Sequence, residues 1–135
     1  RHSHMIPAVI KKIDDAKNQS KDSVDIWGDG SAKREFMYAG DFADFVYYAI
    51  DNFEKMPQNI NVGLGYDYTI DEYYEIIAKA VSYKGSFTHN LSMPTGMQQK
   101  LIDNTKLKDF GWQHQTSLEQ GIQKTYDYFL SEIRK

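Results

Sequence analysis

Three residues of this 135-residue sequence have types that together suit recognition of a phosphorylated sugar or nucleotide. They are Lys12, Trp27 at the end of a short apolar alternation, and Arg34 after the glycine turn 28–31. A guanidinium beside a flexible turn can contact a diphosphate through two hydrogen bonds, and an indole offers a flat face to a sugar or a base. The sequence therefore indicates a small polar and aromatic site, which the rest of the chain must assemble.

The same three residues also have ordinary explanations. Arg34 could form a surface ion pair with Glu35 or Asp29, and Trp27 could be a core aromatic residue. Lys12 could be a solvated lysine on the polar face of a helix. On side-chain chemistry alone these ordinary explanations are favoured, so the site needs further support from the sequence.

Most catalytic motifs are absent from the sequence. None of H-E-x-x-H, G-x-S-x-G or G-x-x-x-x-G-K-[ST] occurs, which argues against a zinc protease, a serine hydrolase and a P-loop protein. Gly63-Leu64-Gly65 lacks the third glycine of a dinucleotide fingerprint and precedes Tyr66-Asp67-Tyr68, which does not read as a helix. No tyrosine has a lysine four residues later, and no histidine spacing is typical of metal ligands. We therefore expect no metal site and no complete redox site in this chain.

Composition narrows the class of protein. With 135 residues, 41% of them hydrophobic, the chain has the size of one compact domain. The absence of cysteine excludes disulfides and thiolate metal sites and favours a reducing compartment, the cytoplasm. No apolar run approaches the roughly 20 residues that span a bilayer. A net charge of −3 argues against general electrostatic binding of nucleic acid.

Hydrophobic spacing predicts an α+β chain. Capping boxes at Thr69/Glu72 and Ser117/Gln120 mark the starts of two helices, one from 70 to near Gly85 and one from 118 to the C-terminus. Apolar residues at helical spacing predict further helices over 5–18, 42–53 and 105–110. Alternation and turn residues predict strands over 24–27, 34–38, 59–62 and 86–88, with a Pro-Gly loop over 92–96.

A longer motif adds to the evidence from single residues. The stretch from Trp27 to Asp44 resembles the segment W-G-x-G-x-x-x-R-E-F-x-[YH]-V-x-D of extended short-chain dehydrogenases that act on nucleotide sugars, in particular the GDP-L-fucose synthase group. Residues 3–8 resemble that family's S-H-V-I-P-A, and residues 60–65 resemble its I-N-V-G-x-G. Residues 111–130 resemble its C-terminal end. The resemblance thus extends over most of the chain.

The resemblance implies a division of labour between two domains. In that α/β family an N-terminal Rossmann domain holds the coenzyme and supplies a serine, a tyrosine and a lysine. Residues 1–135 resemble the C-terminal substrate-binding portion, which we expect to be inactive by itself. The resemblance also implies a homodimer that forms through the Rossmann domain.

Roles for individual residues follow from the same resemblance. His4 matches a histidine that acts as general acid/base in epimerisation, next to the nicotinamide of NADPH. Lys12 matches a basic substrate contact, and Trp27 and Arg34 match residues that hold the GDP-sugar, with the arginine on the diphosphate. The implied reaction is 3,5-epimerisation and 4-reduction of GDP-4-keto-6-deoxy-mannose, giving GDP-L-fucose or a related GDP-sugar.

Two departures leave the sugar open. The family has V-D-D where this chain has Ala39-Gly40-Asp41, and P-D-G-T-P-R-K where it has residues 94–100, P-T-G-M-Q-Q-K. Since the second segment is a substrate-facing loop, the substrate could be another GDP-linked deoxy sugar or a heptose. An alternative from a different class is a stand-alone α+β binding module that uses Trp27 and the tyrosines as its surface. Roughly 170–190 upstream residues that open with a strand and a glycine-rich turn would favour the enzyme.

Overall fold

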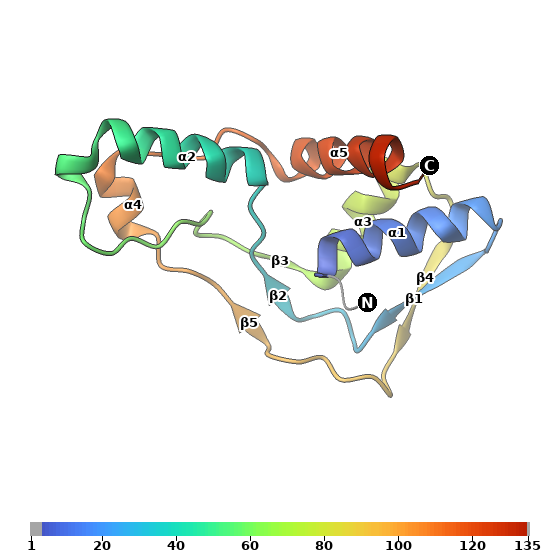
Figure 1. Cartoon of the computed structure of the whole chain (residues 1–135). Coiled ribbons are helices and arrows are strands. Elements are labelled where there is room, and N and C mark those ends of the chain that lie inside the picture. Colours follow the sequence, from blue (N-terminus) through green and yellow to red (C-terminus); the bar gives the residue numbers. More distant parts are fainter. Residues whose placement is uncertain (1–3, 135) are drawn as a thin grey trace.

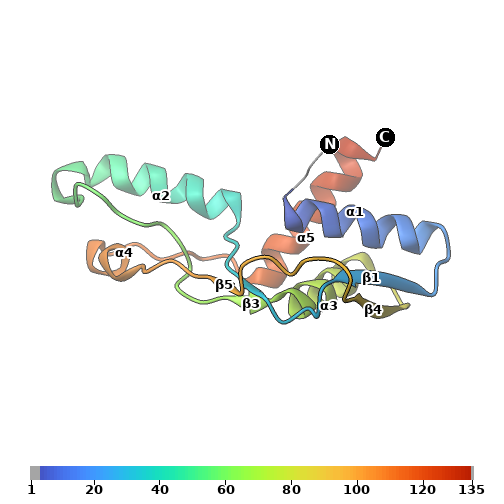
Figure 2. The ribbon, with the colours of Figure 1, turned by 90° about the horizontal axis from the view of Figure 1, so that it is seen from below.

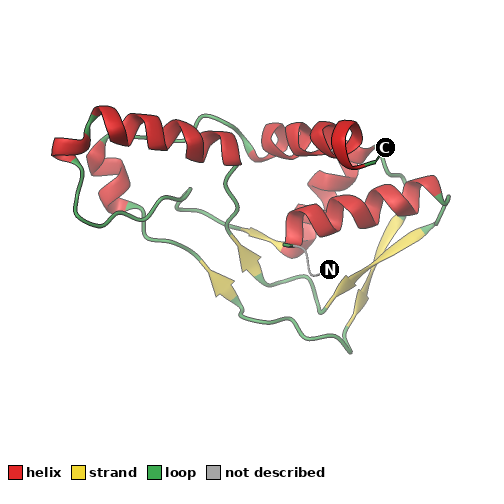
Figure 3. Ribbon diagram, viewed as in Figure 1, coloured by secondary structure: helices red, strands yellow, loops and turns green. Residues whose placement is uncertain are grey.

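The computed structural model describes residues 4–134, so Ser3 of the N-terminal motif lies outside the described residues. Helices and small sheets alternate along the chain, as the α+β prediction requires (Figures 1 and 3). The helices are α1 (Met5–Asn18), α2 (Ala39–Asp51), α3 (Ile70–Val81), α4 (Thr105–Phe110) and α5 (Leu118–Tyr128), with a 3-10 turn at Phe53–Lys55 and a π-helical turn at Phe129–Ile133. The strands are β1 (Ser23–Trp27), β2 (Lys33–Arg34), β3 (Tyr68–Thr69), β4 (Ser86–Asn90) and β5 (Gln99–Lys100).

The main body is formed by α1, α3 and α5 together with the parallel pair β1–β4. Its apolar core contains Ile10, Ile13, Ile26, Tyr73 and Ile77, each at most 1% exposed. These residues come from elements far apart in sequence, so the core joins both halves of the chain.

A second, smaller cluster of buried apolar residues lies at the other end of the molecule, where α2 and α4 lie next to each other (Figure 2). Phe45 and Ala49 of α2 pack there with Leu107 of α4 and with Trp112. The indole Nε1 of Trp112 donates a hydrogen bond of 2.9 Å to the Asp44 carboxylate. Extended segments, among them the sheet β3-β2-β5, connect this cluster to the main body.

Both capping boxes are present. The Thr69 hydroxyl accepts from the backbone N–H of Glu72, and the Ser117 hydroxyl accepts from that of Gln120. In each case a side-chain oxygen of the third residue accepts a hydrogen bond from the backbone N–H of the cap residue. The predicted helix starts at 70 and 118 are therefore confirmed, together with their physical reason, whereas the first of these helices ends at Val81, before the expected end near Gly85.

Two strand predictions were wrong. The strand expected over 34–38 is reduced to Lys33–Arg34, and the strand expected over 59–62 is not formed. Residues 60–62 make no backbone hydrogen bond to any other described segment, although their sequence alternates as a strand does. A strand needs a partner strand as well as an alternating sequence, and no described segment supplies one here.

No helix of the described part of the chain is long and apolar enough to cross a membrane.

Candidate functional site

Trp27 and Arg34 lie along one loop, because their strands pair with the two strands that flank that loop. Trp27 at the end of β1 is in register with Asn90 at the end of β4, and Arg34 on β2 is in register with Lys100 on β5. Backbone hydrogen bonds from Gly28 to the Asn90 carbonyl (3.0 Å) and from Lys33 to the Gln98 carbonyl (2.8 Å) continue the contact between the two segments. We call residues 91–98 the β4–β5 loop.

The glycine turn between Trp27 and Arg34 is held on two sides. Gly28 has φ +75°, and a Cβ placed there would lie 2.4 Å from Cγ2 of Thr95 in the β4–β5 loop. Gly30 also has φ +75°, and a Cβ there would lie 1.8 Å from the Asp71 carboxylate. Glycine is thus required by conformation and by space at both positions, and the turn fixes the path from Trp27 to Arg34.

Arg34 is half-buried and has no carboxylate partner among the described residues. Its Nη1 donates to the Lys33 carbonyl at 2.7 Å, and its Nη2 lies beside Gly96 of the β4–β5 loop. The Tyr73 hydroxyl donates to the Arg34 carbonyl at 3.0 Å and fixes the backbone. The ordinary explanation of Arg34 as an ion pair was wrong, and within residues 4–134 its guanidinium donates a hydrogen bond only to the Lys33 carbonyl.

The two expected ion-pair partners of Arg34 are bound elsewhere. Asp29 accepts hydrogen bonds from the backbone N–H and the hydroxyl of Ser31, and these bonds lower the pKa of its carboxyl group. Glu35 accepts from the backbone N–H groups of Leu64, Gly65 and Ile102, the last two at 3.0 Å. The sequence analysis missed this role of Glu35, for which the R-E-F motif was the available signal.

The bonds to Glu35 also decide what the Gly63–Gly65 turn can do. Its N–H groups at 64 and 65 already donate to a carboxylate of the protein, and a short strand follows in place of a helix. A pyrophosphate would need such N–H groups free and directed from a helix N-terminus. The Gly63–Gly65 turn therefore does not fit the pyrophosphate of a dinucleotide.

Lys12 and Trp27 both interact with Asp25. The Lys12 ammonium lies 2.7 Å from the Asp25 carboxylate and 2.5 Å from the Asp25 carbonyl oxygen. The hydrogen bond from Lys12 is the largest cause that lowers the pKa of Asp25, and the Trp27 side chain adds a smaller contribution. Trp27 is 58% exposed, so its assignment to the core was wrong, and Lys12 is ion-paired rather than merely solvated.

His4 is separate from these three residues. It caps α1 with non-helical backbone and is exposed, and its imidazole has no hydrogen-bond or ionic partner among residues 4–134. Along α1 it lies eight residues before Lys12, about 12 Å at the rise of an α-helix. No hydrogen bond or ion pair in the described part of the chain joins His4 to Lys12, Trp27 or Arg34.

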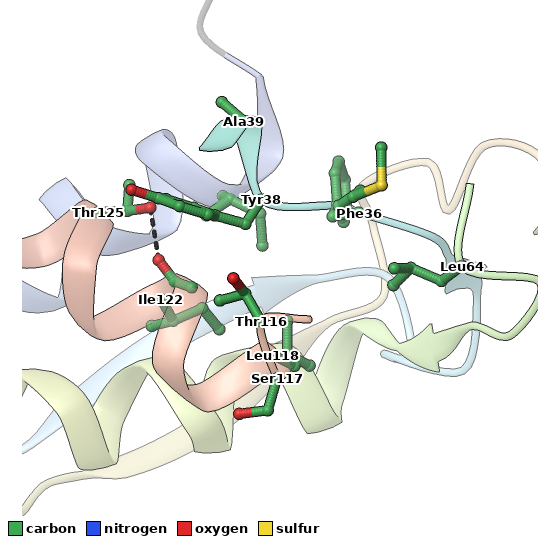
Figure 4. Close-up of a pocket in the computed structure, with 12 residues that line it drawn as sticks. Phe36, Tyr38, Ala39, Leu64, Thr116, Ser117, Leu118, Ile122 and Thr125 are labelled. Atoms are coloured by element: carbon green, nitrogen blue, oxygen red, sulfur yellow. Dashed lines mark hydrogen bonds between the residues drawn. The ribbon is translucent and has the colours of Figure 1, made fainter. Parts of the chain in front are cut away.

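An apolar cavity of about 230 Å³ opens beside the start of α1. Figure 4 shows side chains of the segment 36–39 and of the beginning of α5 around it. Ile6, two residues after His4, contributes to its wall. Of its polar residues, Thr116 is held by Asp41 and Thr125 donates to the Gly121 carbonyl. The cavity suits an apolar group rather than a charged one.

Comparison with known proteins agrees with these observations. Residues 1–63 match the NAD dependent epimerase/dehydratase family. The GDP-L-colitose synthase of Yersinia pseudotuberculosis is 63% identical over 131 residues, 97% of this chain and 42% of that protein. The GDP-L-fucose synthase of Azorhizobium caulinodans is 44% identical over the same shares of both chains.

A solved structure extends the likeness to the fold. The GDP-mannoheptose C4 reductase from Campylobacter jejuni, solved with NADP bound, superimposes with a TM-score of 0.83 at 30% identity, over 97% of this chain and 46% of that one. The chain spans less than half the length of the relatives that it matches. On this agreement in sequence and in fold, the chain belongs to the NAD dependent epimerase/dehydratase family, in which its relatives include the GDP-L-fucose and GDP-L-colitose synthases.

Proposed function

We propose that this chain is the GDP-sugar-binding portion of an NADPH-dependent epimerase/reductase. The observation that carries the proposal is Arg34, a half-buried guanidinium that has no carboxylate partner among residues 4–134 and lies beside Gly96 of the β4–β5 loop. An anionic ligand could accept charge-assisted hydrogen bonds from the remaining N–H donors of this group. A diphosphate is the anion that best matches its planar donors.

Trp27 and Lys12 complete the proposed site. The exposed indole of Trp27 provides a flat face on which guanine or the sugar can lie. The ion pair of Lys12 with Asp25 holds its ammonium close to Trp27, where a small shift would bring it to the substrate. The three residues then bind one extended molecule along the β4–β5 loop.

The sugar is the finer part of the proposal. The relative with 63% identity is named for GDP-L-colitose, not for GDP-L-fucose. Thr95, which stands where the fucose synthase motif has aspartate, packs directly against Gly28 of the glycine turn. We therefore propose a GDP-linked 4-keto deoxy sugar related to, but different from, 4-keto-6-deoxy-mannose.

The chemistry assigned to this chain is proton transfer. The His4 imidazole would act as general acid/base on one face of a carbon next to the keto group, since imidazole suits proton transfer near neutral pH, and a second group would exchange the proton on the opposite face. NADPH, held by a domain outside this chain, would supply the hydride that reduces the ketone. We further propose that His4 contacts the nicotinamide end, that the longer enzyme is a homodimer formed through that domain, and that it acts in the cytoplasm.

The test uses a fusion enzyme, in which the N-terminal part of the Yersinia GDP-L-colitose synthase precedes this chain in place of the relative's own matching segment. Arg34→Lys keeps the charge but loses the planar fork, so GDP-sugar affinity should fall about tenfold or more, roughly 1.5–3 kcal/mol. Calorimetric titration with GDP-L-fucose measures it. Arg134→Lys, at an arginine that binds Asp14 instead, is the control and should leave affinity unchanged.

Activity provides a second measurement. The 135-residue chain alone should not oxidise NADPH with a GDP-4-keto sugar, whereas the fusion enzyme should. Equal affinity of wild type and Arg34→Lys would remove Arg34 from the site. Failure of the fusion enzyme to bind any GDP-sugar would favour the stand-alone binding module.

A further inference from the structure

The start of α3 holds the glycine turn 28–31 in place. The backbone N–H of Asp71 donates to the Gly30 carbonyl at 3.2 Å, and the next bond, from Ile70 to the Ala32 carbonyl, measures 2.9 Å. The Asp71 carboxylate occupies the space that a Cβ at Gly30 would need, since its Oδ1 would lie 1.8 Å from that atom. The first N–H groups of a helix have no partner inside the helix. The two bonds therefore satisfy the helix start and fix the turn.

His89 of β4 binds the carboxylate that lies against this turn. Its Nε2 is 2.9 Å from Oδ1 of Asp71, the oxygen closest to a Cβ at Gly30. Phe87, two residues earlier, packs against Tyr74, three residues after Asp71, at a ring-centroid distance of 5.5 Å. Residues two apart share a face of a strand, and residues three apart share a face of a helix. The two contacts thus follow one another between β4 and α3, and only the aromatic one belongs to the core.

The Asp71–His89 pair connects the segments that carry the proposed binding site. The glycine turn joins Trp27 to Arg34, and β4 continues into the β4–β5 loop beside Arg34. His89 is in register with Ile26, the neighbour of Trp27 on β1. The bond from His89 to Asp71 therefore ties the turn to the strand pair that ends at Trp27.

We propose that Asp71 and His89 are positioning residues for the GDP-sugar. Their bond holds the glycine turn in the conformation in which Trp27 and Arg34 bind one ligand, and neither residue of the pair contacts that ligand. The inference rests on the proposed function and adds two residues to it. Glycines give a turn many accessible conformations, and the apparent affinity for a ligand falls with the fraction of molecules in the binding conformation.

The exposure of the pair sets the size of the expected effect. The side chains of His89 and Asp71 are 39% and 40% exposed, so neither fills the core. An exposed pair of this kind changes an equilibrium constant by about two- to fivefold. We therefore expect an affinity loss of about that size when the pair is broken.

Replacing His89 tests the pair without altering α3. In the fusion enzyme, His89→Ala should weaken binding of GDP-L-fucose about two- to fivefold in a calorimetric titration. With a GDP-4-keto sugar, KM should rise while kcat stays unchanged, because the turn carries binding residues only. His89→Gln should restore wild-type affinity, since its amide nitrogen can donate to Asp71 from about the position of the imidazole Nε2. His89→Leu, which has no donor, replaces His89→Ala should that variant fail to fold.

A second histidine provides the matched control. His114 is bonded to the Tyr66 hydroxyl at 3.0 Å, a contact as exposed as that of His89. His114→Ala removes one hydrogen bond of the same kind outside the turn and should leave GDP-L-fucose affinity unchanged.

A double variant tests whether the two residues act as a pair. Asp71→Ala also removes an acidic residue from the first turn of α3, which weakens the helix by itself. Adding His89→Ala to Asp71→Ala should therefore cost no further affinity, because the bond is already lost. Additive losses of affinity would overturn the inference.

Hydrogen exchange tests the hold on the turn without any ligand. In the fusion enzyme with His89→Ala, the amides of Ile70 and Asp71, which donate to the turn, should exchange faster than in wild type. In His89→Gln and His114→Ala they should exchange at the wild-type rate. Mass spectrometry of the peptides that contain these amides measures the rates.

Each outcome decides the inference. Wild-type affinity in His89→Ala would overturn it, as would equal losses in His89→Ala and His89→Gln. Weaker binding with unchanged exchange at 70 and 71 would make His89 a ligand contact and would also overturn it. A fusion enzyme that binds no GDP-sugar would contradict the proposed function, whereas one that binds GDP-L-fucose equally well with and without the pair would contradict this inference alone.

Discussion

At the residue scale, the exposure of Trp27 could have been predicted from its own strand. Val24 and Ile26 are buried in β1, so Asp25 and Trp27 must lie on the opposite face of a strand with period two. The ion pair between Asp25 and Lys12 could not be predicted in the same way, because it depends on how α1 packs on β1. The types of the site residues were thus predictable from the sequence, whereas their partners depended on tertiary contacts.

His4 provides the residue-scale prediction for catalysis. In the fusion enzyme, His4→Asn should slow the uptake of solvent deuterium into the sugar by about 10²- to 10⁴-fold, the usual contribution of a general acid/base. Binding of the GDP-sugar should change little, because binding is assigned to Lys12, Trp27 and Arg34. Mass spectrometry of the recovered sugar measures the exchange, with His114→Asn as the control. An unchanged exchange rate would assign His4 no role in proton transfer.

At the element scale, helices were predicted more accurately than strands. The helices over 70–81 and from 118 carry their start signals locally, in side chains three residues apart. The strand pattern at 59–62 is equally clear, but its partner is not among the described residues. Strand β2 ends at Arg34. Two residues later the Phe36 ring packs edge-on against the Tyr73 ring of α3, at a ring-centroid distance of 5.3 Å. Local signals specify helices, whereas strands depend on distant segments.

Glu35 connects the segment after β2 to the Gly63–Gly65 turn and to Ile102, which no local sequence signal predicts. These hydrogen bonds lead to a prediction about stability. Glu35→Gln replaces one carboxylate oxygen by an amide donor, so at least one of the three backbone N–H groups loses its acceptor. We expect the free energy of unfolding to fall by about 1–3 kcal/mol. Urea denaturation measures the change, and Glu75→Gln at an exposed position of α3 should alter it by no more than about 0.5 kcal/mol. Equal effects of the two variants would show that Glu35 does not stabilise these segments.

At the scale of the whole molecule, one buried carboxylate connects the two ends of the chain. Asp14 of α1 is 1% exposed and accepts hydrogen bonds from the Tyr126 hydroxyl of α5 (2.8 Å) and from Arg134 (3.0 Å). Burial, followed by the bond to Asp14, raises the pKa of Tyr126 to about 12. Burial likewise raises the pKa of Tyr74, in the same core, to about 12. The main body therefore depends on tyrosines that must stay protonated.

This dependence predicts alkaline instability of the main body. An unfolded tyrosine loses its proton near pH 10 and folded Tyr126 near 12, so above pH 10 the unfolded state binds fewer protons. The stability contributed by Tyr126 is fully present below pH 10 and is lost as the pH rises through about 12. Tyr126→Phe should lower the free energy of unfolding at neutral pH, through the lost bond to Asp14, yet make its alkaline decline shallower. Urea denaturation at a series of pH values measures both effects. Tyr128→Phe, at a position 61% exposed on the same helix, should leave the slope unchanged, and equal slopes for both variants would contradict the assignment.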